Sequence, residues 1–307
     1  MLLNRSIKKL VFSFFLFIAP VTALASACCG GGFAMPALIT GDDHATVTTS
    51  YSYSKVDSDV TDAGVWIKRN NDDLTSKVFK IDGAFVFDDR YQAGLSVPIQ
   101  TRSKQGGFSE DSTGLGDVSA LAGYEYLPDW DYNPWRPHGV GFLTLTLPTG
   151  KSIQETQTVS GIDGRGRGFW ALGVGTTLTK AWTVWDGNST FEVHRSFDKT
   201  VHNAQIDGTI KPGYGGSFVM GAGYNIKGLR LGTTLSWNYE DAINVVGNNS
   251  SDGSVERFAT GTVSASYMFK ESWAATASYS DQTLFGDPTR TTLSKIVAVS
   301  LQKRWTR

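Results

Sequence analysis

The sequence has few cysteines and no excess of charge of either sign. Its 2 cysteines, Cys28 and Cys29, stand side by side near the N-terminus. They therefore cannot form the disulfide framework of a small secreted domain. Lys and Arg together number 28 against 29 for Asp and Glu, and the net charge is −1. This balance excludes the basic footprint of a nucleic-acid-binding protein, so no nucleic-acid partner is predicted.

The sequence has no long apolar run after residue 27. Residues 1–27 have a basic start, the apolar stretch "LVFSFFLFIAPV" and a final "ASA", the pattern of a secretory signal peptide. No later stretch reaches the ~18 apolar residues that a transmembrane helix needs. If the remaining chain spans a membrane, it must do so as a closed β-barrel, because only helices and closed barrels satisfy their backbone polar groups in lipid.

Cys28 directly follows the predicted cleavage point, which makes it a candidate for lipidation. Ala25 occupies the position three residues earlier, where a lipidation signal usually has Leu, and Leu24 stands one place too early. A free or paired thiol is the alternative for Cys28.

Alternation between apolar and polar residues is abundant. In "LRLGTTLSWNY" (229–239), Leu231 and Leu235 point one way, while Arg230 and Ser236 point the other. A period of two is typical of a strand with one apolar and one polar face. The apolar face is the inside of a soluble sandwich but the outside of a membrane barrel.

Twelve alternating runs follow one another along the chain. They lie at residues 44–56, 75–88, 91–103, 114–127, 138–149, 167–180, 183–196, 212–226, 229–241, 255–269, 272–283 and 291–304. The connections between them alternate between long and short, with 128–137 as the one exception. Short periplasmic turns, long extracellular loops and an even strand number are typical of bacterial outer-membrane barrels. The predicted fold is all-β, a transmembrane antiparallel barrel of about twelve strands over residues 44–307, preceded by a signal peptide and located in the bacterial outer membrane.

Strand direction then predicts which aromatic side chains lie at the two membrane interfaces, where amphipathic rings gather. The predicted aromatic belts contain Tyr91, Tyr124, Tyr126, Trp170, Trp182, Trp185, Trp237, Tyr239, Tyr267, Trp273 and Trp305. The expected partners of such a surface are outer-membrane lipid and the machinery that inserts barrels.

The polar faces of the strands are predicted to line a lumen. The lining residues expected from the pattern are Lys80, Asp82, Gln100, Arg102, Asp117, Glu125, Asp186, Asn188, Glu192, His194, Arg230, Asn238 and Arg304. Asp186 and Glu192 are expected to form an acidic column that faces Arg230 and Arg102 across the lumen. Barrels of twelve strands lie between filled eight-stranded barrels and open sixteen-stranded porins, so a narrow passage is predicted.

The segment before the first strand, residues 28–43, is apolar for a periplasmic terminus. Phe33, Met35, Leu38 and Ile39 all need to be covered. We expect the segment either to fold up into the lumen as a plug or to lie against the periplasmic turns.

Two short motifs carry a family resemblance. In "TGLGDVSALAGYEYL" (113–127) a Gly-Leu-Gly-Asp run opens a strand, and in "LTLTLPTGKS" (143–152) a strand ends in Leu-Pro-Thr-Gly. Both resemble the outer-membrane family named for the meta pathway of phenol degradation. The resemblance implies a barrel that passes small organic, often aromatic, compounds. Considered only as local structure, Gly114 and Gly116 permit a tight approach to a strand, and Pro148 marks a strand end.

The sequence does not favour catalysis. "VHRSF" (193–197) places His194 and Ser196 on one strand, as in the outer-membrane phospholipase A family. The catalytic pair of that family must face lipid, whereas His194 shares a polar face with Glu192. The 4 histidines show no spacing typical of zinc ligands. No catalytic residue, metal or cofactor is predicted.

The sequence thus predicts an outer-membrane channel for small solutes, hydrophobic or aromatic ones among them. A non-conducting barrel with a structural or surface-binding role is the leading alternative. A lipid-acting outer-membrane enzyme is a third, less favoured one.

Overall fold

A computed structural model of the chain describes residues 37–306, apart from 71–72, 108, 132, 159, 203–206, 248–249 and 251. In this part of the chain, no helix has the length and apolar character needed to cross a membrane. The predicted signal peptide, Cys28 and residues 28–36 of the N-terminal segment lie outside the described residues.

Within the described residues, twelve antiparallel strands close into a barrel, as predicted. They are β1 (Asp43–Val60), β3 (Asp73–Phe87), β4 (Tyr91–Gln105), β6 (Val118–Leu127), β7 (His138–Leu147), β8 (Ala171–Ala181), β9 (Trp185–Ser196), β12 (Tyr214–Ile226), β13 (Leu229–Glu240), β15 (Glu256–Phe269), β16 (Trp273–Asp281) and β17 (Thr292–Thr306). Each strand pairs with the next one in this order, and β17 pairs antiparallel with β1 to complete the ring. Closure leaves no free sheet edge, which is the requirement for a sheet in lipid.

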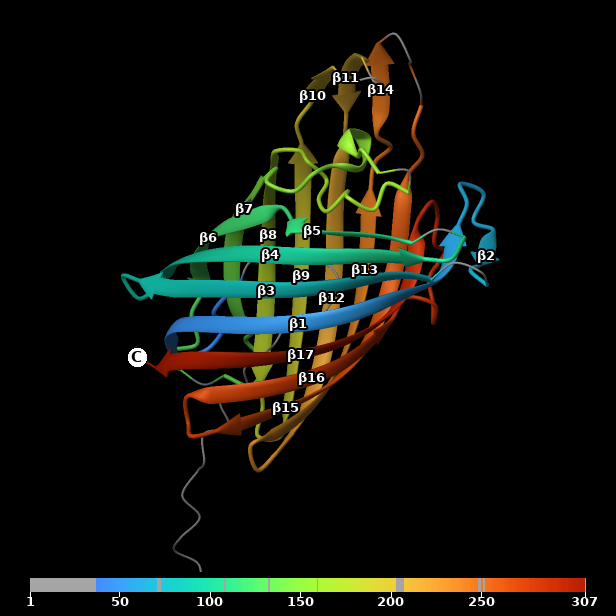
Figure 1. Cartoon of the computed structure of the whole chain (residues 1–307). Helices are drawn as coiled ribbons and strands as arrows, with labels where there is room; N and C mark the ends of the chain where they lie inside the picture. The colour runs from blue at the N-terminus through green and yellow to red at the C-terminus, as the bar shows by residue number, and fades with distance from the viewer. Residues whose placement is uncertain are drawn as a thin grey trace, which may run out of the picture.

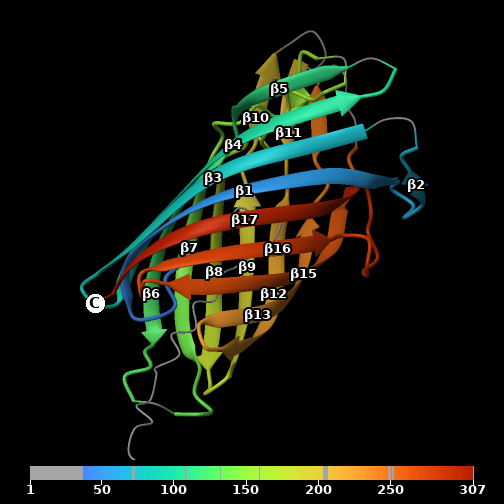
Figure 2. The same cartoon turned by 60° about the horizontal axis from the view of Figure 1, so that its bottom comes forward.

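The barrel has two different ends. The short connections and the C-terminus lie together at what we call the short-turn end, on the left and at the bottom in Figures 1 and 2. The opposite, long-loop end carries the connections 61–72, 106–117, 148–170, 197–213, 241–255 and 282–291. In Figure 1 the near strands β1, β3 and β4 run across the view while β9, β12 and β13 run up it, so the strands are strongly tilted around the barrel.

Tight hairpins explain the short-turn end. The connection between β12 and β13 consists of Lys227 and Gly228, with φ of 46° and 87°. Positive φ at both central residues is the geometry of a type I′ turn, whose twist matches that of the flanking strands. The connection 128–137 is the one long connection at this end, as the sequence predicts.

The long-loop end adds secondary structure of its own. The added elements are β2 (Trp66–Lys68), β5 (Glu110–Leu115), the 3₁₀-helix η1 (Ile153–Glu155), β10 (Lys199–His202), β11 (Asp207–Lys211) and β14 (Asn244–Gly247). β10, β11 and β14 form a small sheet that rises above the barrel at the top of Figure 1. The predicted strand 114–127 is wrong in one respect, because it is divided at Gly116 and Asp117 into β5 and β6.

The barrel wall is apolar outside and polar inside. On β13, Leu231 and Leu235 are exposed on the outer face, whereas Ser236 and Asn238 are only 4% and 5% exposed on the inner face. Buried apolar side chains form two small clusters near the two ends of the barrel, and Leu121, Val140 and Phe142 are also buried on the inner faces of β6 and β7. This distribution is the reverse of that in a soluble sandwich and is typical of a membrane barrel.

Candidate functional site

The lumen is the candidate functional site, and its wall is built from the inner faces of the strands. Among the predicted lining residues, the structure buries Asp82, Asp186, Glu192, His194, Arg230, Asn238 and Arg304, and it leaves Lys80, Gln100, Arg102, Asp117, Glu125 and Asn188 partly buried. The predicted lining consists mainly of charged and amide side chains, and hydroxyl side chains also belong to it. Ser96, Ser119, Thr177, Thr190 and Thr260 are also buried on inner faces, where the same alternation places them.

Ion pairs occupy the wall near the short-turn end. Arg230 donates from Nε and Nη2 to the two carboxylate oxygens of Asp186, at 2.8 and 2.6 Å, and both side chains are buried. Arg304 donates to Asp43 at 2.7 Å, which ties the last strand to the first. Paired charges of this kind satisfy each other in a wall of low dielectric.

The pairing of Arg230 corrects one expectation. Arg230 does not face Asp186 across the lumen, because the two residues lie on β13 and β9, with only β12 between them. Gly223 on β12 makes the contact possible, since a Cβ at this position would collide with the Arg230 guanidinium. Asp186 is therefore a paired carboxylate rather than a member of an open acidic column.

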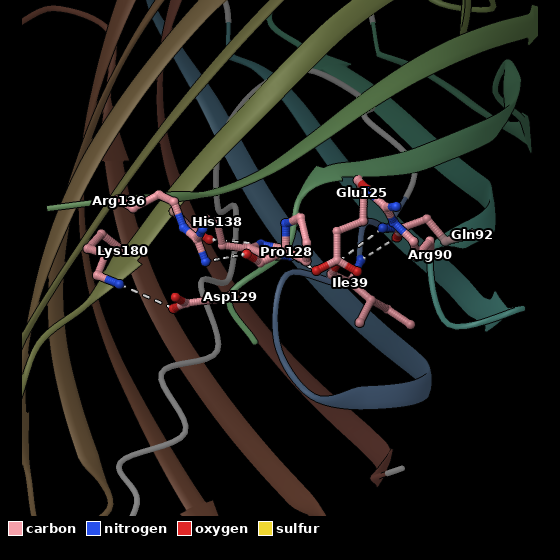
Figure 3. Close-up of polar contacts among 10 residues, drawn as sticks. Ile39, Arg90, Gln92, Glu125, Pro128, Asp129, Arg136, His138 and Lys180 are labelled. Atoms are coloured by element: carbon pink, nitrogen blue, oxygen red, sulfur yellow. Dashed lines mark hydrogen bonds and ion pairs between the residues drawn. The ribbon is translucent and has the colours of Figure 1, made fainter. Parts of the chain in front are cut away.

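Residues 37–42, the described part of the N-terminal segment before β1, lie in the lumen at the short-turn end, where Ile39 contacts Gln92 (Figure 3). The backbone N–H of Ile39 donates to Gln92 Oε1 at 2.8 Å, and Gln92 Nε2 donates to the Ile39 carbonyl at 3.1 Å. The Ile39 side chain packs on Ala84 and Val86, which lie on the inner face of β3. Residues 37–42 therefore cover part of the inner wall at this mouth, and the prediction of a plug stays a prediction for residues 28–36.

The exceptional connection 128–137 is held at the same mouth. Arg136 donates to the Pro128 carbonyl at 3.2 Å, and Lys180 of β8 pairs with Asp129 at 3.2 Å. Nearby, His138 Nε2 lies 2.8 Å from a carboxylate oxygen of Glu125 (Figure 3). These contacts hold the described residues of this connection at the short-turn end.

The loop 148–170 closes part of the other mouth. The carboxylate of Asp117 accepts hydrogen bonds from the backbone N–H groups of Gly150 at 2.9 Å and Arg167 at 2.7 Å. Arg102 on the inner face of β4 donates to the Gly164 carbonyl at 2.5 Å. Asp117 thus holds the two ends of the loop together, which is why the chain leaves the strand at this residue.

Asp163 is the inner anchor of this loop. Its carboxylate accepts from Lys151 Nζ at 2.5 Å, Thr158 Oγ1 at 2.7 Å and the Gln157 N–H at 3.0 Å. Burial by itself would raise the pKa of Asp163, but these hydrogen bonds outweigh it and hold the pKa below the ordinary Asp value. The loop is therefore organised around an ionised carboxylate.

A buried network of charged side chains joins the loop 148–170 to strands β9 and β13. His194 Nδ1 lies 3.2 Å from Glu192, and His194 Nε2 lies 3.2 Å from Glu240 on β13. Arg167, from the loop 148–170, pairs with Glu240. Gly215 on β12 has no side chain, which leaves room for His194 of β9 and Glu240 of β13 to meet over it.

No family model matches the sequence, and no curated protein does. Among solved structures, an outer-membrane channel from Pseudomonas putida F1 superposes with a TM-score of 0.70 at 15% identity, covering 90% of this chain and 100% of that chain. The chain has the fold of an outer-membrane channel. The NanC porin (TM-score 0.46, 7% identity, 84% and 98% covered) and a TodX monoaromatic hydrocarbon channel mutant (TM-score 0.40, 8% identity, 86% and 91% covered) are more distant. These likenesses concern the fold, and the family named for phenol degradation is not confirmed.

In this channel fold, the residues of the predicted aromatic belts point outward. Tyr91, Tyr124, Tyr126, Trp170, Trp182, Trp185, Trp237, Tyr239, Tyr267 and Trp305 are exposed, and Trp273 is half-buried. Neighbouring rings pack on one another, as Tyr91 and Tyr124 do with 5.0 Å between ring centroids. Lys303 lies 5.2 Å from the Trp273 ring centroid, which places its charge among aromatic faces.

The channel fold leaves His194 unsuited to catalysis with Ser196. Both ring nitrogens of His194 face carboxylates, so neither is directed at a nucleophile. A serine nucleophile needs a base that can accept its proton. The inner-face pair of His194 and Glu240 is instead part of the contact between the loop 148–170 and the wall.

Proposed function

We propose that this chain is a channel of the bacterial outer membrane that passes small solutes, aromatic compounds among them, through the barrel lumen. The observation that carries the proposal is the reversed wall, with exposed apolar side chains outside and buried polar side chains inside. A wall of this kind is stable in lipid and offers a polar route through it. In this proposal residues 1–27 direct export, insertion machinery places the barrel, and the short-turn end is periplasmic.

The charges of the wall support a channel with weak ion selectivity. Asp186 is paired with Arg230, Asp43 with Arg304, and Lys80 Nζ lies 3.0 Å from Asp82. Between the ends, hydroxyls bond one another, as Thr177 and Thr190 do at 2.9 Å. A lumen of compensated charges and hydroxyls has no strong field to select ions of one sign.

Segments of the chain narrow both mouths, so the proposal also includes restricted flow. Residues 37–42 cover the inner wall near Gln92, and the loop 148–170 lies against Arg102. The aromatic solutes come from the family resemblance alone. The channel itself is supported by the wall and by the channel fold of the Pseudomonas putida F1 relative in structure.

Single-channel recording in planar bilayers tests the proposal. The refolded protein should conduct weakly, with a reversal potential near zero in a KCl gradient. Asp117→Ala removes the acceptor that holds the loop 148–170, so conductance should rise. Lys77→Ala is the matched control, since Lys77 is exposed on the outer face of β3 and its loss should leave conductance unchanged. Liposomes containing the protein should admit arabinose and benzoate.

A correctly folded but silent barrel would contradict the channel. If neither the full chain nor Asp117→Ala conducts, and neither solute enters liposomes, a structural or surface-binding barrel would replace it. Retained heat-modifiable gel mobility establishes that the silent protein is folded.

A further inference from the structure

The outer wall has an apolar hollow at the long-loop end. The hollow has a volume of about 520 Å³ and lies over β9, β12, β13 and β15. Its floor contains Gly216 and Ala259, and its sides contain Tyr214, Phe218 and Trp237. Its volume lies within the ~300–1,000 Å³ of typical small-ligand sites.

The hollow exists because two small residues stand at outward positions. In the register, Gly216 lies between Val193 on β9 and Tyr239 on β13. Ala259 lies next to Trp237, and most other outward positions nearby carry large side chains. Gly216 leaves a gap in the wall, and Ala259, which is 2% exposed, lets Gly286 of the loop 282–291 approach closely at the edge of that gap.

The loop 282–291 borders one side of the hollow. The Phe285 ring lies against Trp237, with 5.9 Å between centroids at 66°. Gly286 and Asp287 also line the hollow. The loop therefore turns a shallow strip of wall into a bounded groove.

Two arginine side chains, Arg195 and Arg257, lie near the long-loop side of the hollow. The Arg195 guanidinium lies 4.6 Å from the centroid of the Tyr214 ring. Among the described residues, no carboxylate pairs with Arg195, whereas Arg257 on the other side is paired with Asp287 at 2.5 Å. Arg195 therefore presents its guanidinium beside Tyr214, one of the side chains that line the groove.

We propose that the hollow binds one acyl chain of a phosphorylated lipid in the leaflet around the long-loop end, and that Arg195 binds its phosphate. In lipid, shape and van der Waals contact rather than the hydrophobic effect hold an acyl chain against protein. The groove supplies the shape, and a guanidinium is suited to bidentate bonds with phosphate. The proposal rests on the membrane location in the proposed function, but it does not require that the lumen conducts.

Native mass spectrometry of the refolded full chain in a neutral detergent tests the site. The probe is diphosphoryl lipid A, and a neutral diacylglycerol serves as the comparison lipid. The wild-type chain should retain one lipid A. Arg195→Ala should weaken lipid A binding by about tenfold or more, the range for hydrogen bonds to charged groups, and should leave diacylglycerol binding unchanged.

Two further variants distinguish the contribution of the groove to lipid binding from that of the charge. Val193→Phe fills the groove from an outward position that is 36% exposed, so it should weaken binding of both lipids without affecting folding. Lys77→Ala, which removes an exposed outward cation from β3, should bind lipid A like the wild-type chain.

Equal lipid A binding by the Arg195→Ala and Lys77→Ala variants would overturn the proposal. Dimers that dissociate in Val193→Phe would also overturn it, because a second copy of the chain would then occupy the groove. A silent channel that still binds lipid A through Arg195 would contradict the proposed function and leave the lipid site intact.

Discussion

Replacing Arg230 by Met tests whether the inner wall consists of closed ion pairs. Arg230 and Asp186 are 10% and 5% exposed, and two hydrogen bonds of 2.6 and 2.8 Å join them. Arg230→Met keeps an apolar stem and removes the charge. The Asp186 carboxylate is then left buried, with the Asn225 amide still donating to it at 2.8 Å.

Breaking a buried pair by removing one partner costs about 3–5 kcal/mol, because the other charge stays in a low dielectric. We expect Arg230→Met to lower the free energy of unfolding by this amount. The double variant Asp186→Leu with Arg230→Met removes both charges and should be nearly neutral, as replacements of whole buried pairs often are. The coupling energy from the double-mutant cycle should therefore be about 3 kcal/mol or more.

Equilibrium unfolding in urea, with the barrel in lipid vesicles and tryptophan fluorescence as the signal, measures these free energies. Heat-modifiable gel mobility verifies that each variant starts folded. Asp62→Asn is the control, since Asp62 lies 3.7 Å from Arg290 with both side chains exposed, and its loss should change nothing measurable.

The reasoning is refuted if Arg230→Met costs less than about 1 kcal/mol, the range of an exposed pair. It is also refuted if the double variant loses as much as the two single variants together. Either result would mean that Asp186 and Arg230 are independently solvated and that their charges are open to passing ions.

Three other predictions follow from the faces and ends of the barrel. Val299→Arg places a charge on the outer face near the middle of β17, where Val299 is 52% exposed, and should lower the free energy of unfolding in urea by about 2–4 kcal/mol. Ser300→Arg on the inner face should cost far less, and equal losses of stability would contradict the assignment of an apolar outer face and a polar inner face. The folded pKa of Asp163 lies below its ordinary value, so its hydrogen bonds stabilise the loop 148–170 fully at neutral pH. This stabilisation declines progressively once the pH falls below the ordinary Asp pKa of about 4 and is gone below the folded pKa, so protease cleavage of the loop should rise in acid. Asp163→Asn should show that cleavage already at pH 7. An epitope after Gly161 should be reachable by antibody on intact cells and one after Lys227 should not, and the opposite result would mean that the barrel is inverted.

Local pattern made most of the fold predictable. The predicted runs agree with the barrel strands to within a few residues, because alternation and turn residues are properties of short stretches of chain. The same alternation places residues such as Asp82 and Asn238 on the inner face. The break at Asp117 was missed because its cause, the backbone of Gly150 and Arg167, lies more than 30 residues away.

The sequence by itself determined which side of each strand is polar, since that depends only on a period of two along the chain. The partner of each polar side chain was decided by tertiary structure. Arg230 meets Asp186 because the register places Asp186 opposite Gly223 and Arg230 opposite Asn225, so that the guanidinium can reach across Gly223, a relation that no local pattern contains. The outer hollow likewise forms only where the register brings Gly216 and Ala259 to neighbouring parts of the wall, because a missing side chain leaves a cavity only when its neighbours across the strands also fail to fill it.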